Sequence, residues 1–449
     1  MKKLLVLLLA LLLTCGCFVG CGGKEGSKDS SADGVTELVL WSSYPEESLV
    51  VLRQVIDRFN EEFPQYHLTV EYPGTVANIK MKLTTLRAED YPSIFFGTPA
   101  AIGEYASAEF TAPIQPYLDA DEEKWTEDMY ENVKVVYSDL DGKMIGSPIG
   151  VSAKGYIVNT TALKSAGYEL EDITSFEKLA EAAKAAVSKG IVKYGYDIND
   201  GTDIMDMLLY QGVDILDADN GFGGEVTKCL YGEGETHEAL KKLLTLQAGL
   251  YADDAAYINN SGAQGGSSLF ANGELMFWSC TNSLIYEFSD LELGFDWAFI
   301  PHVGVDENAK YKGYALTEGT GMFIANTGNE TEMQGAYEFI KYMARTDNQV
   351  FWATYRGYVP FTKAAAEHED WIAFQKEVFP SSERLIEMMQ NTPSDFRQPY
   401  GNLVTPITSA NKDMEGFIMS EPNGDIDGYI QDGLDSINES IEILRLRGQ

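Results

Sequence analysis

Aromatic and small polar side chains stand where the predicted strands of this sequence end. Trp41 and Tyr44 follow one strand, and Ser279 and Thr281 close another. Aromatic faces can stack on the C–H faces of a sugar, while polar groups pair with its hydroxyls, each pair contributing about 1 kcal/mol. The other residues of this kind are Thr98, Ser152, Asn199, Asp200, Asn282, Gly319 and Tyr358. The pattern predicts a binding site for a small polar solute.

Within this set we expect Trp41 and Tyr358 to stack on a ring, and Asp200 and Ser152 to bond hydroxyls. An arbitrary aromatic residue belongs to a hydrophobic core more often than to a ligand site. Tyr44 and Tyr358 stand in turn contexts, which favours a ligand contact for both.

No catalytic or metal-binding motif accompanies these residues. The four histidines stand far apart and form no paired-ligand motif, so a zinc site is not expected. There is no nucleophile elbow, phosphate loop or dinucleotide fingerprint, and the Asp217–Gly221 segment lacks the last Glu of an EF-hand loop. We expect a protein without enzymatic activity, cofactor or metal. The rival hypothesis, an exported glycoside hydrolase, requires two carboxylates about 5 to 10 Å apart in a cleft.

Strands and helices alternate along the chain. Strands are predicted at 35–40, 67–72 and 93–96, and helices at 49–63 and 78–87. This order predicts an α/β fold with a mostly parallel sheet, in which ligands lie beyond the carboxyl ends of the strands.

A second α/β unit follows residues 143–158, where Pro148, Gly150 and Gly155 interrupt apolar residues as in a chain crossing between two lobes. It contains predicted strands at 194–198 and 274–279. Three later helices are predicted to begin with capping boxes, Thr174/Glu177, Asn329/Glu332 and Thr346/Gln349. The helix that begins at Thr346 is predicted to end at Gly357. The last predicted helix spans 426–446.

The first residues form an export signal. Lys2 and Lys3 precede ten apolar residues, Leu4 to Leu13. This run is too short for a membrane-spanning helix, which needs roughly 20. Cys21 then precedes a Gly-rich polar tether and resembles the lipidated Cys of bacterial lipoproteins, with Cys17 as the alternative and an ordinary cleaved signal as a third possibility. Two or more acyl chains hold a protein stably on a membrane. We therefore expect the folded part of the chain to be displayed outside the cell on a lipid anchor.

Composition limits the partners. The chain of 449 residues has 69 acidic and 33 basic side chains, a net charge of −36, which disfavours nucleic acid and anionic lipid. Beyond the leader only Cys229 and Cys280 remain. They could form a disulfide, but we expect both to be buried apolar fillers.

Four segments resemble family 1 extracellular solute-binding proteins, in particular the glycerol-3-phosphate-binding and maltose-binding subgroup. They are Leu40–Ser42, Ile56–Pro64, Phe270–Met276 and Gly357–Ala365, and the likeness runs from about Leu38 to Leu446. It implies a periplasmic-binding-protein-like fold, two α/β lobes with a hinge and an interlobe cleft. The expected division is 1–20 signal peptide, 21–36 tether, 37–149 with 318–365 as one lobe, and 150–317 with 366–449 as the other.

The resemblance also assigns roles. Ser152, Gly319 and Tyr358 match ligand-binding positions, and either Ser279 or Thr281 matches a hydroxyl donor of the second lobe. Three positions depart from the glycerol-phosphate binders: Val76 and Pro99 replace a Tyr and a Glu, and Pro406–Thr408 lacks the phosphate-binding Arg. We therefore expect a monomer that passes an uncharged carbohydrate to the permease subunits of an ABC importer, with service to a sensor kinase as an alternative.

Overall fold

The computed structural model describes residues 34–446 except 199–200, 259–263 and 288–290. The predicted export signal, the lipidation site at Cys21 and the ligand contact Asp200 lie outside the described residues. Within the described ranges, no helix combines the length and apolar character that crossing a membrane requires.

The first sheet has the strand order β2-β1-β3-β11-β4, with β5 also paired to β11. Its strands are β1 Thr36–Trp41, β2 Tyr66–Glu71, β3 Ile94–Gly97, β4 Thr111–Ala112, β5 Ser147–Ser152 and β11 Glu318–Ala325. β1 runs parallel to β2 and β3, since helices return the chain between them. β11 runs antiparallel to β3, β4 and β5 because the chain re-enters this sheet from the second lobe.

The second sheet has the order β10-β6-β9-β7-β8. Its strands are β6 Lys154–Asn159, β7 Tyr194–Ile198, β8 Ala256–Ile258, β9 Leu275–Thr281 and β10 Trp297–Pro301. β7 is parallel to β8 and β9, whereas β6 is antiparallel to β9 and β10. Both sheets are therefore mixed, and the expectation of a mostly parallel sheet was wrong because strands adjoining the crossovers enter each sheet in the opposite direction.

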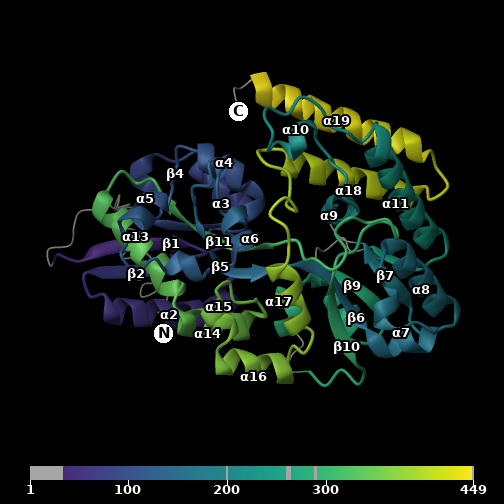
Figure 1. Ribbon diagram of the computed structural model, residues 1–449, viewed down its shortest axis with the longest axis horizontal. Coiled ribbons are helices and arrows are strands. Elements are labelled where there is room, and N and C mark those ends of the chain that lie inside the picture. The colour runs from purple at the N-terminus through teal and green to yellow at the C-terminus, as the bar shows by residue number, and fades with distance from the viewer. Residues whose placement is uncertain (1–33, 199–200, 259–263, 288–290, 447–449) are drawn as a thin grey trace, which may run out of the picture.

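Helices cover both sheets, giving two lobes side by side (Figure 1). The first lobe contains α2 Leu49–Glu62, α3 Val76–Leu83, α4 Ile102–Ser107, α5 Gln115–Ala120, α6 Glu131–Val136, α13 Glu330–Met343, α14 Thr346–Arg356 and α15 Lys363–Ala366. The second contains α7 Thr160–Ala166, α8 Phe176–Ser188, α9 Thr202–Gln211, α10 Asp217–Asn220, α11 Gly234–Ala252, α12 Gln264–Ala271, α18 Val404–Ser420 and α19 Ile426–Leu446.

Two helices, α16 Glu369–Glu377 and α17 Ser382–Gln390, connect the lobes. α16 packs on α14 and α15, and α17 contacts both α6 and β10. Phe379 and Leu385 belong to an apolar cluster that holds the core of the first lobe together with second-lobe residues such as Phe299. The chain therefore keeps contact with the first lobe beyond residue 366, where we expected the second lobe to begin. Similarly, it changes sheet at Ala153, between β5 and β6, rather than at 149.

The helix boundaries follow local chemistry. Asn329 caps α13 by accepting from the amides of Thr331 and Glu332, and Gly357 ends α14 with a φ of 68°, both as predicted. Ser175, not Thr174, caps α8, and α14 follows Arg345 without a side-chain cap, so the other two capping boxes were wrong. Cys229 and Cys280 are both buried and neither forms a disulfide with another described residue, which confirms their role as core fillers.

Candidate ligand-binding site

Three hydroxyl groups meet at the end of the first sheet where β1 finishes and β11 begins. The Tyr44 hydroxyl oxygen lies 2.7 Å from that of Tyr358 and donates to Thr320 Oγ1 over 2.9 Å. Thr320 Oγ1 and the Tyr358 hydroxyl are 3.2 Å apart. The three come from the loop after β1, the start of β11 and the segment after α14, so this hydroxyl cluster depends on the tertiary fold.

Core packing fixes both tyrosine rings. Tyr44 packs edge-on against Phe96, with centroids 5.5 Å apart, and its amide donates to the buried Ser42 hydroxyl. The Tyr358 ring lies so close to Gly150 that a Cβ there would stand 2.5 Å from its Cγ. Tyr44 and Tyr358 are buried, with 8% and 4% of their surfaces exposed, so neither offers a ring face for stacking. Burial raises the pKa of Tyr44, so its hydroxyl stays neutral at physiological pH.

The strand-end residues of the first lobe lie around this cluster. Ser152 is buried at the end of β5 and is the register partner of Glu318. Gly319 precedes Thr320 and has a φ of 137°, and any Cβ on it would overlap the Gly150 carbonyl oxygen. Only glycine fits this close strand pairing. Thr98 follows Gly97, whose register partner Gly321 adjoins Thr320.

Trp41 lies further out and is only partly buried. Its indole N–H donates to Glu71 Oε2 over 2.9 Å, and the Lys82 ammonium lies 5.7 Å from the ring centroid. Of the two residues predicted to stack on a sugar ring, Trp41 therefore keeps part of its ring exposed, whereas Tyr358 does not.

In the second lobe Ser279 belongs to a buried polar cluster that sequence reasoning missed. Its hydroxyl donates to Asp203 Oδ2 over 2.5 Å. His302 lies between two carboxylates, with Nε2 3.7 Å from Asp203 Oδ1 and Nδ1 3.4 Å from Asp206 Oδ2. All four side chains are nearly inaccessible. No sequence spacing reveals this group, because β9, α9 and the segment after β10 each supply part of it.

Thr281, the other hydroxyl candidate of this lobe, bonds Ser283, with 2.6 Å between their oxygens. Nearby, the Lys154 ammonium donates to the hydroxyl of Thr202 at the start of α9. Lys154 was not among the predicted residues, although it directly follows the crossover.

Two side chains connect the lobes. Asn282, after β9, accepts from the Ala153 amide over 2.8 Å and donates to the Gly357 carbonyl over 2.7 Å. Gln398 donates to Glu318 Oε1 over 2.8 Å and to Asp206 Oδ1 over 3.4 Å. The bonds of Asn282 place the ends of β9 and β5 and the Tyr358 segment next to one another.

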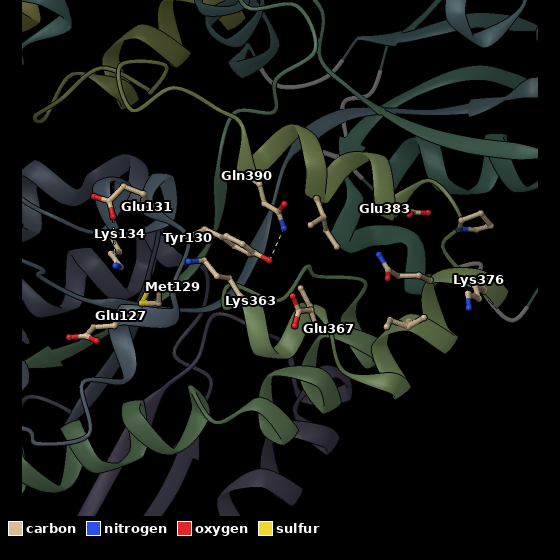
Figure 2. Close-up of a pocket in the computed structure, with 15 residues that line it drawn as sticks. Glu127, Met129, Tyr130, Glu131, Lys134, Lys363, Glu367, Lys376, Glu383 and Gln390 are labelled. Carbon is tan, nitrogen blue, oxygen red and sulfur yellow. Dashed lines mark hydrogen bonds and ion pairs between the residues drawn. The ribbon is translucent and has the colours of Figure 1, made fainter.

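A large groove of about 1120 Å³ lies elsewhere, among η4 (Trp125–Asp128), α6, α15, α16 and α17. Figure 2 shows charged side chains of both signs along it, with Gln390 donating to the Tyr130 hydroxyl over 2.7 Å. None of the predicted ligand residues lines this groove. The strand-end site therefore remains the better candidate, because polar groups from both lobes converge there.

Two mixed α/β lobes joined by crossing segments, with polar strand ends between them, define the periplasmic binding protein class. The structure of UgpB from Mycobacterium tuberculosis in complex with glycerophosphocholine matches with a TM-score of 0.73 and 16% identity, covering 92% of this chain and 100% of that one. The sugar-binding protein MalE from Xanthomonas citri matches with a TM-score of 0.72 and 17% identity over 92% and 98%. These likenesses confirm the fold.

The family model for "Bacterial extracellular solute-binding protein" matches residues 54–378, so this chain belongs to that family. The sn-glycerol-3-phosphate-binding periplasmic protein of Shigella dysenteriae is 24% identical over 376 residues, which is 81% of this chain and 82% of that protein. The family consists of non-enzymatic binding proteins outside the cytoplasm, and this protein is one of these extracellular solute-binding proteins.

Proposed function

We propose that this protein captures an uncharged sugar or polyol between its lobes by hinge closure and delivers it to an ABC permease. The observation that carries the proposal is the hydroxyl cluster of Tyr44, Thr320 and Tyr358, which lies next to Ser152 and is joined through Asn282 to the second lobe. Neutral hydroxyls both donate and accept, as the hydroxyls of a sugar require. Ligand contacts on both lobes would favour the closed state.

The ligand-contact set is Trp41, Tyr44, Thr98, Ser152, Asp200, Thr281, Gly319 and Tyr358, to which we add Thr320 and Gln398. Ser279 has a supporting part, because its hydroxyl already bonds Asp203. Val76 and Pro99, at the start of α3 and in the turn before α4, offer no charge to a phosphate. Burying a phosphate without a cation would cost several kcal/mol.

One observation favours a second candidate ligand, an anionic polyol such as glycerol 3-phosphate. Lys154 places an ammonium beside Thr202 at the amino end of α9, where helix geometry also favours negative charge. A thermal-shift screen distinguishes the two, because a ligand at 100 times its Kd stabilises the folded state by about 2.7 kcal/mol. Sugars should raise the Tm by several degrees and glycerol 3-phosphate should not; the reverse result would replace the first proposal by the second.

We also propose that Cys21 carries the lipid anchor. Cys21→Ser should release the protein from cell membranes into the medium, and Cys17→Ser should not. Release by Cys17→Ser alone would move the anchor to Cys17. A permease gene beside this one would favour transport over service to a sensor kinase.

A further inference from the structure

An apolar pocket lies between strand β10 of the second lobe and the connecting helix α17, which stand side by side in Figure 1. Its volume is about 250 Å³. It is lined mainly by residues 299–304, residues 311–314 and one face of α17. No residue of the proposed ligand-contact set lines it, so this pocket is separate from the strand-end site.

The walls of the pocket are fixed by contacts within the protein. The Phe299 amide donates to Ser381 Oγ over 3.1 Å, which ties β10 to the start of α17. The Tyr311 ring stacks on Phe396 with centroids 4.3 Å apart, and its hydroxyl donates to Asp395 Oδ2 over 3.1 Å. A pocket that is already formed binds a ligand with little loss of conformational entropy.

The lining favours a planar apolar ligand. Arg384, Leu385 and Met388 share the face of α17 that lines the pocket, because Met388 follows the other two by four and three residues. Leu385 and Met388 make this wall apolar, and Phe299 and Pro301 belong to the wall of the second lobe. A cavity of about 150 Å³ lined by Leu, Ile and Phe holds benzene. The larger volume here therefore has room for two fused aromatic rings.

The charges around the pocket favour an anion. Its lining includes the basic side chains Lys312 and Arg384 and one carboxylate, Glu171, although the whole chain has a net charge of −36. The Lys312 ammonium lies 3.1 Å from Glu307 Oε2. Arg384 is exposed and forms no hydrogen bond or ion pair with another residue in the described part of the chain. A guanidinium binds a carboxylate through two parallel hydrogen bonds, so Arg384 suits a carboxylate on the ligand.

We propose that this pocket is a second ligand site, which binds an aromatic carboxylate of two fused rings, with its rings between β10 and α17 and its carboxylate on Arg384. This inference does not rest on the proposed function, and either can fail without the other. The probe for the test is indole-3-acetate, and the uncharged indole-3-acetamide is its comparison.

Ligand-observed NMR titration of the purified protein with each probe tests the inference. Wild type should bind indole-3-acetate with a Kd of about 1 mM or tighter, and the amide about ten-fold more weakly. Arg384→Met removes the donors but keeps an apolar stem, so it should weaken indole-3-acetate about ten-fold and leave the amide unchanged. Met388→Trp should abolish binding of both probes, because the larger ring fills the pocket. Arg445→Met is the matched control and should change neither affinity, because Arg445 bonds Glu225 at the surface.

Several results would overturn the inference. Wild type that shows no saturable binding of indole-3-acetate at about 10 mM has no such site. Equal affinity for the acid and the amide, or binding unchanged in Arg384→Met, would remove the role of the carboxylate. Displacement of the probe by a sugar that binds this protein would place the probe in the strand-end site. Association of two protein copies that Met388→Trp abolishes, measured by light scattering, would assign the pocket to a protein partner.

Circular dichroism confirms that each variant is folded. Arg384 is exposed, so Arg384→Met keeps the test decisive even where Met388→Trp does not fold.

Discussion

The hydroxyl oxygens of Tyr44 and Tyr358 lie 2.7 Å apart, although the two residues are 314 positions apart in the sequence. Tyr44 also donates to Thr320, so one bond to each partner ties the loop after β1 to the crossover segments. A site built across such distant segments exists only when the first lobe is fully folded.

We expect Tyr44→Phe and Tyr358→Phe each to lower the free energy of unfolding by about 1 to 2 kcal/mol, because each removes the bond that the two hydroxyls share and Tyr44→Phe also removes the bond to Thr320. The double variant should lose less than the sum of the two, since the residues share that bond. Urea unfolding measures all three, with Tyr72→Phe, an exposed tyrosine, as control. Strictly additive losses would contradict a shared bond.

Ser279→Ala should lower the free energy of unfolding by about 1 to 3 kcal/mol, because the buried Asp203 carboxylate loses a donor. Sugar affinity should change little, since the hydroxyl points to Asp203. Ser188→Ala, on the exposed side of α8, is the control and should change neither quantity. The opposite pattern, lost affinity with unchanged stability, would make Ser279 the ligand contact that the sequence predicted.

Gly103 in α4 touches the second lobe. A Cβ on it would lie 2.8 Å from the Gly401 amide nitrogen and 2.9 Å from a Tyr400 ring carbon. Gly103→Val should therefore keep the lobes apart and weaken ligand binding about ten-fold, since overpacking costs about 1 to 3 kcal/mol. Gly416→Val is the control, because a Cβ there meets no atom within 4 Å. Equal affinity in both variants would show that binding does not require this contact.

The stability of the protein should fall in alkaline solution. Burial raises the pKa values of Tyr44, Tyr137, Tyr156 and Tyr196 well above the usual value near 10. In the unfolded chain these hydroxyls ionise near pH 10, while the folded protein keeps them neutral, so their contribution to stability is constant below about pH 9 and falls above about pH 10. Denaturant unfolding across this range measures the change; a flat profile to pH 11 would contradict the burial of these hydroxyls.

The sequence predicted the elements with strong local signals. The strand at 194–198 and the helix at 426–446 have the predicted bounds, because periodicity and turn residues act locally. Mixed pairing was missed, since the direction of β11 depends on where the chain re-enters the sheet. The cluster of Asp203, Asp206 and His302 was missed for the same reason: each residue is unremarkable in its own segment, and only the tertiary fold brings the segment after β10 against α9.

The sequence likewise predicted some features of the candidate site and missed others. Turn contexts identified Tyr44 and Tyr358, and the structure brings these two together, but their sequence did not show that core packing would cover the ring faces. Gly319 was predicted as a ligand contact; the structure shows that it also permits a close strand pairing with Gly150, and its neighbour Thr320 supplies the hydroxyl.

Titration calorimetry on wild type and on the Tyr44→Phe/Tyr358→Phe double variant tests the central claim most directly, with a sugar that raises the Tm and with glycerol 3-phosphate as ligands. We predict that wild type binds the sugar and not glycerol 3-phosphate, and that the double variant, with its rings in place, binds the sugar about ten-fold more weakly. Tight glycerol 3-phosphate binding, or sugar binding indifferent to the loss of both hydroxyls, would contradict the claim that this hydroxyl cluster holds an uncharged solute.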